Sequence, residues 1–188
     1  PLVTLVSLVS NGVTKLIGIN LDDAENEELK PEELRTLLQT SRVPKRQENM
    51  LMGIFDMDYL SVNDVMVPKN EIVGIDLNDD IETILGELQT IDYTYIPCFE
   101  DSIDNILGFL TINKKADFYG RKDLTAKALK SELQDPLFVP ENTSLSKQLS
   151  NFQSANARVG LIVDEYGDIE GIITLRAILE VIVGEITS

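Results

Sequence analysis

The sequence contains no histidine and only one cysteine among its 188 residues. Without histidine, the chain has no imidazole general base, no Ser-His or Cys-His nucleophile pair and no His-ligated zinc. A single cysteine excludes an internal disulfide and a thiolate metal cluster, as is common in a reducing compartment. Because Cys98 lies inside an apolar run, we expect it to be a plain core thiol rather than a reactive one.

Basic residues are also scarce, since 16 Lys and Arg stand against 32 Asp and Glu and give a formal net charge of −16. This charge repels nucleic-acid phosphates and anionic headgroups, and no local cluster of basic residues offsets it. We therefore expect no nucleic-acid partner. The hydrophobic content of 43% is that of a soluble globular protein with a core of its own.

We expect no signal peptide, and the first 20 residues predict an amphipathic helix. Between residues 2 and 19 the only charge is Lys15, and apolar residues recur at helical spacing. The segment is short and rich in Ser, Thr and Asn for a membrane span, so we interpret it as juxtamembrane or interfacial; packing on a soluble core is the alternative. Because the sequence begins with Pro1 and ends directly after an apolar helical pattern, we expect a fragment of a longer protein.

Residues 21–59 form an acidic segment that we interpret as a helical linker. Pro31 followed by Glu32 and Glu33 suits a helix N-terminus, where free amides and the helix dipole favour negative charge; a divalent-cation site is the alternative. A second helix is predicted by an apolar pattern at Met50, Leu51, Ile54, Phe55 and Met57.

The clearest structural pattern lies in residues 159–183. Two apolar, β-branched runs flank an acidic turn with Gly167, and a helical pattern follows from Leu175. A looser copy lies upstream, in which Gly108 and Thr111 repeat the Gly-x-x-Thr of Gly171 and Thr174 at a distance of 63 residues. One structural unit is therefore predicted twice.

Each unit is predicted as strand, helix, strand, strand, helix, over residues 60–122 and 123–188. This pattern indicates an α+β fold. Neither unit holds enough apolar residues to close a core comfortably by itself, so we expect the two units to pack face to face through their sheets.

Four motifs carry a resemblance to a known family: Asp64-Val65-Met66-Val67-Pro68, Tyr93-Thr94-Tyr95-Ile96-Pro97, Val163-Asp164-Glu165-Tyr166-Gly167 and Gly171-Ile172-Ile173-Thr174-Leu175. In this order they resemble the tandem cystathionine-β-synthase (CBS) domains, or Bateman module, of the CorB/CorC and CNNM family of hemolysin-like membrane proteins linked to magnesium and cobalt transport. The resemblance implies a non-catalytic regulatory module at the cytoplasmic face of the cell (inner) membrane. It implies a homodimer, a membrane domain in the same polypeptide and bound ATP or AMP, with Mg²⁺ as a further candidate ligand.

The resemblance also implies a nucleotide cleft between the repeats, and it carries over to the following candidate residues: Val73, Tyr93, Tyr95, Pro97, Arg158, Thr174 and Arg176. Tyr93 and Tyr95 are alternate residues and should share one strand face, either stacking on adenine or packing in the core. Thr174 is placed to cap the closing helix, to contact ribose or phosphate, or to do both. Arg158 is suited to bind phosphate; the alternative is a solvent-exposed arginine at the end of a strand.

Four positions depart from the pattern of the family. Arg176 and Ala177 stand where two acids are usual, Lys114 takes the matching place in the first repeat, and Tyr95 replaces a common Arg. We therefore expect weaker nucleotide binding that depends less on Mg²⁺. Asp164, Glu165 and Asp168 could form a general acid–base pair, but Asp and Gly are expected there for turn geometry alone.

Two other functional interpretations remain open. The first is a structural dimerisation module that has lost its ligand. The second is a CBS pair that regulates a soluble enzyme. The amphipathic first 20 residues favour the membrane interpretation over the second alternative.

Overall fold

The computed structural model describes residues 33, 35–36, 43–111 and 125–184. The chain divides into two compact units, Pro1–Pro44 and Lys45–Ser188. In the first unit Glu33, Arg35 and Thr36 are helical. The predicted helix over residues 2–19 lies outside the described residues, as do residues 112–124, which include Lys114 and the predicted closing helix of the first repeat.

The second unit contains the elements that carry both repeats. In chain order they are α3 (Lys45–Asp56), η1 (Val62–Asp64), β1 (Val67–Pro68), η2 (Lys69–Glu71), β2 (Ile75–Asp76), α4 (Ile81–Thr90), β3 (Tyr95–Glu100), β4 (Ser102–Thr111), α6 (Ala126–Ser131), β5 (Phe138–Pro140), α7 (Leu145–Ala155), β6 (Val159–Val163), β7 (Ile169–Thr174) and α8 (Leu175–Val183). The helix predicted around Met50 is α3, and the pattern at residues 159–183 is β6, β7 and α8 as predicted.

The strand, helix, strand, strand order of the predicted repeat is present twice, as β2-α4-β3-β4 and as β5-α7-β6-β7, and α8 closes the second unit. In each unit the first strand pairs in parallel with the second, through Ile75 and Cys98 in one and through Val139 and Ile162 in the other. The second and third strands then form an antiparallel hairpin. The sheets have the strand orders β2-β3-β4 and β1-β7-β6-β5. Each repeat therefore has the same mixed sheet.

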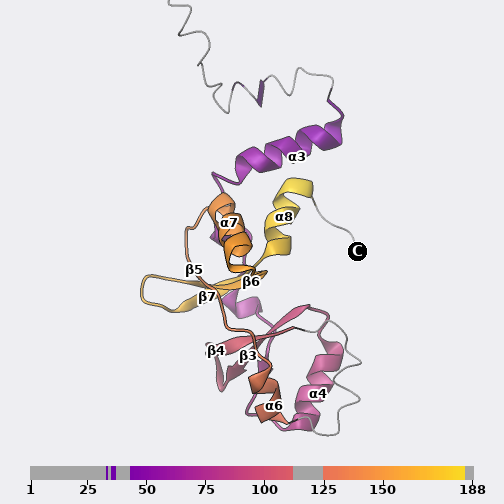
Figure 1. Ribbon diagram of the computed structural model, residues 1–188, viewed down its shortest axis with the longest axis vertical. Helices are drawn as coiled ribbons and strands as arrows, with labels where there is room; N and C mark the ends of the chain where they lie inside the picture. Colours follow the sequence, from indigo (N-terminus) through magenta and orange to yellow (C-terminus); the bar gives the residue numbers. More distant parts are fainter. Residues whose placement is uncertain (1–32, 34, 37–42, 112–124, 185–188) are drawn as a thin grey trace, which may run out of the picture. The chain divides into compact units, whose positions relative to one another are not determined.

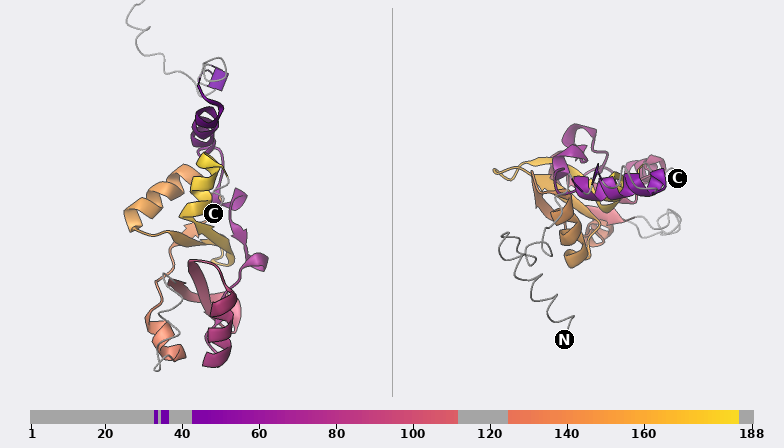
Figure 2. Two further views of the ribbon diagram at one scale, coloured as in Figure 1. Left: turned by 90° about the vertical axis from the view of Figure 1, so that its right-hand side faces the viewer. Right: turned by 90° about the horizontal axis from the view of Figure 1, so that it is seen from above.

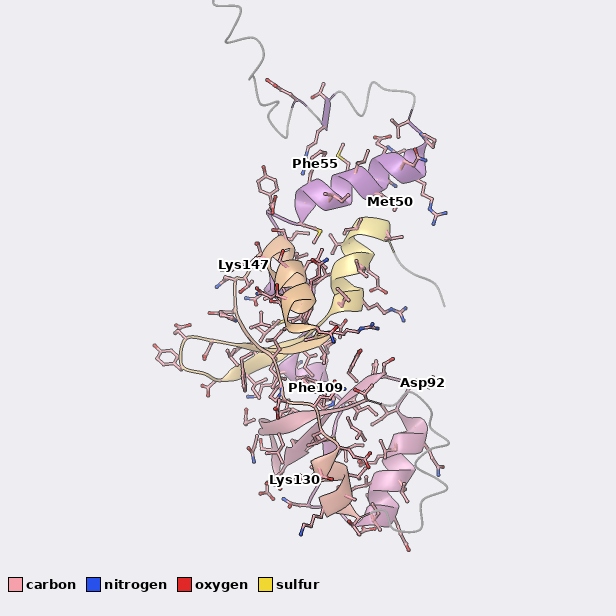
Figure 3. All side chains as sticks on the ribbon, viewed as in Figure 1. Met50, Phe55, Asp92, Phe109, Lys130 and Lys147 are labelled. Atoms are coloured by element: carbon pink, nitrogen blue, oxygen red, sulfur yellow. The ribbon has the colours of Figure 1, made fainter. Side chains whose placement is uncertain are left out.

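The two sheets pack against each other in the middle of this unit. β4 contributes Ile106 and Phe109 to the apolar cluster between them, while β6 and β7 contribute Val159, Leu161, Ile169 and Ile172. Phe109 is labelled in Figure 3, between the sheets. Helices α4 and α6 cover the outer side of the first sheet, and α7 and α8 cover that of the second (Figures 1 and 2). The expectation of face-to-face packing is confirmed.

Each sheet gains a pairing partner from the other repeat's side of the chain. The segment before the first repeat pairs with the second sheet, and the segment before the second repeat pairs with the first sheet. β1 pairs with β7, with Val67 opposite Ile172, while Gln134 bridges to Phe109 of β4. The glycines of the repeated Gly-x-x-Thr permit these approaches. A Cβ on Gly171 would lie 2.6 Å from the Val67 carbonyl oxygen, and one on Gly108 would lie 2.6 Å from that of Gln134. Real Cβ atoms do not come this close to a carbonyl oxygen, so glycine is required at both positions.

Candidate functional site

Thr174 joins the last strand of the second sheet to helix α8. Its Oγ1 accepts a hydrogen bond from the Ala177 amide at 3.1 Å, so the predicted N-cap is present. The Leu175 amide donates to the Arg158 carbonyl oxygen at 2.8 Å, and Val159 pairs with Thr174 across the sheet. Because the cap uses Oγ1 only as an acceptor, the Thr174 hydroxyl can still donate its proton to a ligand.

Two arginines lie at the start of α8, and both are exposed. Arg158 is held there by its carbonyl bond to Leu175, while Arg176 occupies the first turn of the helix. The guanidinium Nε of Arg176 donates to Glu180 Oε1 at 2.9 Å, one turn along the helix. The positive end of the helix dipole and two guanidinium groups favour an anion here, and Glu180 competes with that anion for Arg176.

The first repeat contributes Val73 and Pro97, which lie next to each other. Val73 is exposed in the loop between η2 and β2, whereas Pro97 is buried in β3. The residue after Val73, Gly74, backs directly onto Pro97, since a Cβ there would lie 2.6 Å from the Pro97 carbonyl oxygen. The structure thus places these two candidates close together in the first repeat.

The two candidate tyrosines do not share a strand face as expected. Tyr95 is the first residue of β3 and is half-buried against the cluster between the sheets, to which Val159 also belongs. Tyr93 lies in the loop before the strand, and 63% of its surface is exposed. The strand starts at Tyr95, so the alternation of side chains cannot apply to Tyr93. Tyr95 therefore packs in the inter-sheet layer, and Tyr93 is the tyrosine that is exposed for stacking.

The seven candidates therefore fall into two groups and two separate residues. Arg158, Thr174 and Arg176 gather at the start of α8, and Val73 lies beside Pro97 on the first repeat. Tyr95 lies in the inter-sheet cluster, to which Val159, the residue after Arg158, also belongs. Tyr93 is placed at the surface.

The acidic turn between β6 and β7 is organised by its own backbone. Asp164 Oδ1 accepts from the amides of Tyr166 at 2.9 Å and Asp168 at 2.8 Å. Gly167 has a φ of +89°, a conformation that favours glycine. The Asp164 carboxylate thus serves the turn, in line with turn geometry rather than acid–base chemistry.

Cys98 is a core thiol, as expected. It is buried in the first repeat, where burial raises the pKa of the thiol to about 12. The thiol therefore stays protonated at neutral pH, whereas a reactive cysteine requires the thiolate.

Two structural features are absent from the described part of the chain. That part holds no group of three or more His, Cys, Asp or Glu side chains able to bind a metal ion. It also has no helix with both the length and the apolarity to cross a membrane.

Sequence reasoning missed Gln148, which lies in the middle of α7. It is the only polar or charged side chain in the described residues that is buried, with 0% of its surface exposed. The sequence did contain an indication that Gln148 is buried, because Leu145, Gln148 and Phe152 lie on one face of the helix at helical spacing. Gln148 also lines a hollow of about 370 Å³ between α7 and the edge strand β5.

Two mixed sheets packed face to face, with helices on their outer sides, define a paired α+β module. Residues 129–184 match the CBS domain family. A CBS-domain pair from Klebsiella pneumoniae with bound AMP is 44% identical, with a TM-score of 0.62 over 66% of this chain and 99% of that one. The CBS domain of a bacterial CNNM/CorC family Mg²⁺ transporter in complex with ATP is 30% identical, with a TM-score of 0.68 over 76% of this chain and 100% of that one. The chain belongs to the CBS-domain pairs of the CNNM/CorC family.

A full-length relative extends well beyond the region that it shares with this chain. The UPF0053 inner membrane protein YfjD from Escherichia coli is 37% identical over 191 residues, which cover 100% of this chain and 45% of the relative. The chain thus spans about half the length of that protein. The resemblance to CBS pairs of the CorB/CorC and CNNM family, and the α+β fold that it implied, are confirmed.

Proposed function

We propose that this chain is the regulatory CBS pair of a membrane Mg²⁺ or Co²⁺ transport protein, and that it senses ATP or AMP in the cleft between its repeats. It acts without catalysis at the cytoplasmic face of the cell (inner) membrane, beside a membrane domain of the same polypeptide. The single observation that carries this proposal is the arrangement of Thr174, which caps α8 while its hydroxyl remains able to donate.

The phosphate end of the nucleotide is assigned to the start of α8. Helix N-termini favour anions, and Arg158 and Arg176 add two positive charges near the Thr174 hydroxyl. Two amides of the first turn already have partners, since Leu175 donates to Arg158 and Ala177 donates to Thr174. The arginines and the hydroxyl must therefore supply most of the recognition, and Arg176 must turn away from Glu180 to take part.

The adenine end is assigned to the first repeat. Val73 and Tyr93 are exposed, and Val73 adjoins Pro97, so they offer apolar and aromatic surface for a flat base. Tyr95, two residues before Pro97 in β3, is half-buried in the inter-sheet cluster. Two relatives with bound AMP and ATP support an adenine nucleotide as the ligand class.

Mg²⁺ is assigned a lesser role than the nucleotide. A bridging cation needs carboxylate oxygens beside the phosphates, whereas this chain has Arg176 and Ala177 at the positions where acids are usual in the family. Arg176 attracts bare phosphate without a cation. Nucleotide binding should therefore depend only weakly on Mg²⁺.

Regulation requires that binding favours one arrangement of the module over another. A nucleotide that contacts both repeats favours arrangements in which Thr174 and Pro97 face the same cleft. Helix α8 starts at the site and packs on α3, which leads back toward the N-terminal segment. A change in the cleft can therefore be passed along α8 to α3.

Titration calorimetry with ATP, with and without Mg²⁺, tests the proposal. The wild type should bind in both conditions with similar affinity. The double variant Arg176→Glu/Ala177→Asp restores the acids and should gain Mg²⁺-dependent binding, about tenfold or more from two added hydrogen bonds. If the double variant gains no such binding, the nucleotide does not bind in this cleft. If neither protein binds AMP or ATP at all, the ligand-free dimerisation module is the better account.

A further inference from the structure

The connecting segment, residues 67–76, joins the two sheets of the second unit. It begins in β1, which pairs with β7 of the second repeat, and it ends in β2, which pairs with β3 of the first repeat. Between these strands, Ile72 packs against the inter-sheet cluster. Val73, the candidate for contact with adenine, follows directly and is 50% exposed. The position of Val73 therefore depends on how the connecting segment is held between the repeats.

Lys69 lies within the connecting segment and forms an ion pair with a residue of the first repeat. Its Nζ pairs with Oδ1 of Asp104, in β4. The other carboxylate oxygen of Asp104, Oδ2, accepts a hydrogen bond from the Ser102 hydroxyl at 3.0 Å. Because Ser102 already orients the carboxylate, less side-chain freedom is lost when Lys69 pairs with it.

Lys69 also lies close to two acids of the second repeat. The antiparallel register of β1 on β7 brings Lys69 next to Glu170, and η2 packs on β7. The hydrogen bond to Asp104 raises the pKa of the Lys69 amine, and the charges of nearby acids, Asp168 and Glu170 among them, raise it further. One cation thus lies among carboxylates from both repeats. Without its charge these carboxylates would repel one another.

We propose that Lys69 is a positioning residue for the nucleotide cleft, because it holds the connecting segment against both repeats and so fixes Val73 close to Pro97. This inference rests on the function proposed above. The side chains of Lys69 and Asp104 are 38% and 62% exposed, and exposed ion pairs contribute little to the stability of a fold. The role of Lys69 is therefore to favour one arrangement of the connecting segment.

Amide hydrogen exchange tests whether Lys69 holds the segment, and it needs no nucleotide. The Ile72 amide donates to the Lys69 carbonyl oxygen at 3.2 Å. Lys69→Gln should speed exchange of this amide about two- to fivefold, whereas Lys69→Arg, which keeps the charge, should leave it unchanged. Lys130→Gln is the matched control, because it removes an exposed ion pair with Glu100 that lies outside the connecting segment. It should also leave the Ile72 amide unchanged.

Titration calorimetry with AMP and ATP tests whether the held segment positions Val73. Lys69→Gln should lower the affinity for both nucleotides by the same factor, about two- to fivefold, because both carry the adenine that contacts Val73. Lys69→Arg and Lys130→Gln should bind like the wild type. In Lys69→Gln/Asp104→Asn the loss should be smaller than the product of the two single losses, because each single change already breaks the same pair.

Three results would overturn this inference alone. The first is unchanged exchange of the Ile72 amide in Lys69→Gln. The second is equal nucleotide affinity of the wild type and Lys69→Gln. The third is a loss that is larger for ATP than for AMP, which would show that the Lys69 charge acts on the phosphates and not through Val73. A wild type that binds neither nucleotide would instead contradict the proposed function, and this inference with it.

Discussion

Gly53 of α3 and Val181 of α8 are in backbone contact. A Cβ placed on Gly53 would lie 2.4 Å from the Val181 carbonyl oxygen and 2.8 Å from the Cα of Ile182. No real Cβ approaches backbone atoms this closely, so the two helices meet at this point only because residue 53 is glycine. The contact ties the helix that precedes the repeats to the last helix of the second repeat.

Replacing Gly53 by Ala should therefore push α3 away from α8. We expect a net loss of about 1–3 kcal/mol in the free energy of unfolding, as is typical of overpacking. Gly86→Ala in α4 is the matched control, because no atom lies within 4 Å of a Cβ at that position. It should stabilise the protein by up to about 1 kcal/mol through helix propensity. Urea denaturation measures the free energy of unfolding of both variants. Equal changes in the two variants would contradict the contact between α3 and α8.

Thr174→Val should lower stability and nucleotide affinity together. Loss of the N-cap should destabilise the protein by about 1 kcal/mol. Loss of the hydroxyl should lower the affinity for ATP, measured by calorimetry, about five- to tenfold. Thr125→Val is the matched control, because Thr125 caps α6 with the same 3.1 Å bond, to Ala128. It should lose similar stability without a change in ATP affinity. A similar loss of ATP affinity in both variants would show that Thr174 acts only through stability.

Much of the second repeat could be predicted from the sequence because its signals are local. The β-branched runs of β6 and β7, the glycine of the turn and the apolar spacing in α8 each act within a few residues. The capping role of Thr174 follows from its place between strand and helix. The ion pair between Arg176 and Glu180 was also readable, because it spans one helical turn.

The exchange of segments between the repeats was not predicted, for a physical reason. β1 has two residues, and its partner, Ile172 in β7, lies about a hundred residues later, so no local periodicity indicates the pairing. The position of Tyr93 was missed because the sequence does not define the first residue of β3. Gln148 was missed because a glutamine on an apolar helix face is usually assigned to the surface.

Acid should destabilise the protein partly through Asp80, which caps α4. The Thr83 hydroxyl donates to its carboxylate at 2.7 Å, and this bond, with the Thr83 and Glu82 amides, lowers the pKa of Asp80 below its usual 3.8. A group whose pKa is lower in the folded state than in the unfolded state stabilises the protein at pH values above the unfolded pKa. This contribution is lost as pH falls from 3.8 through the lower folded value.

The variant Asp80→Asn keeps a capping acceptor but cannot titrate. Its stability deficit should be largest at neutral pH and should shrink as pH falls below 3.8. Asp80→Ala, which removes cap and charge together, should retain a deficit at low pH. Urea denaturation across this pH range measures the difference, and a deficit of Asp80→Asn that stays constant with pH would contradict the pKa shift.

The chain should form a homodimer through α8. Leu179 and Val183 are partly exposed on this helix, and Leu51 and Ile54 are partly exposed on α3, which packs on it. Light scattering should give twice the 21.0 kDa chain mass. Leu179→Lys should shift the protein to monomer, whereas Tyr59→Lys, at an exposed apolar residue outside α8, should not. A wild-type monomer at tens of micromolar would contradict this prediction.

The central claim, that an adenine nucleotide binds where α8 begins, is tested most directly by titrating ATP into the ¹⁵N-labelled chain and following backbone amides. The Ala177 amide, which donates to Thr174, and the Leu175 amide, which donates to Arg158, should shift in proportion to occupancy. The Ala128 amide, which has the same capping bond at α6, should stay in place. The account would be contradicted if ATP left Ala177 and Leu175 unchanged, or if it moved Ala128 as much as Ala177.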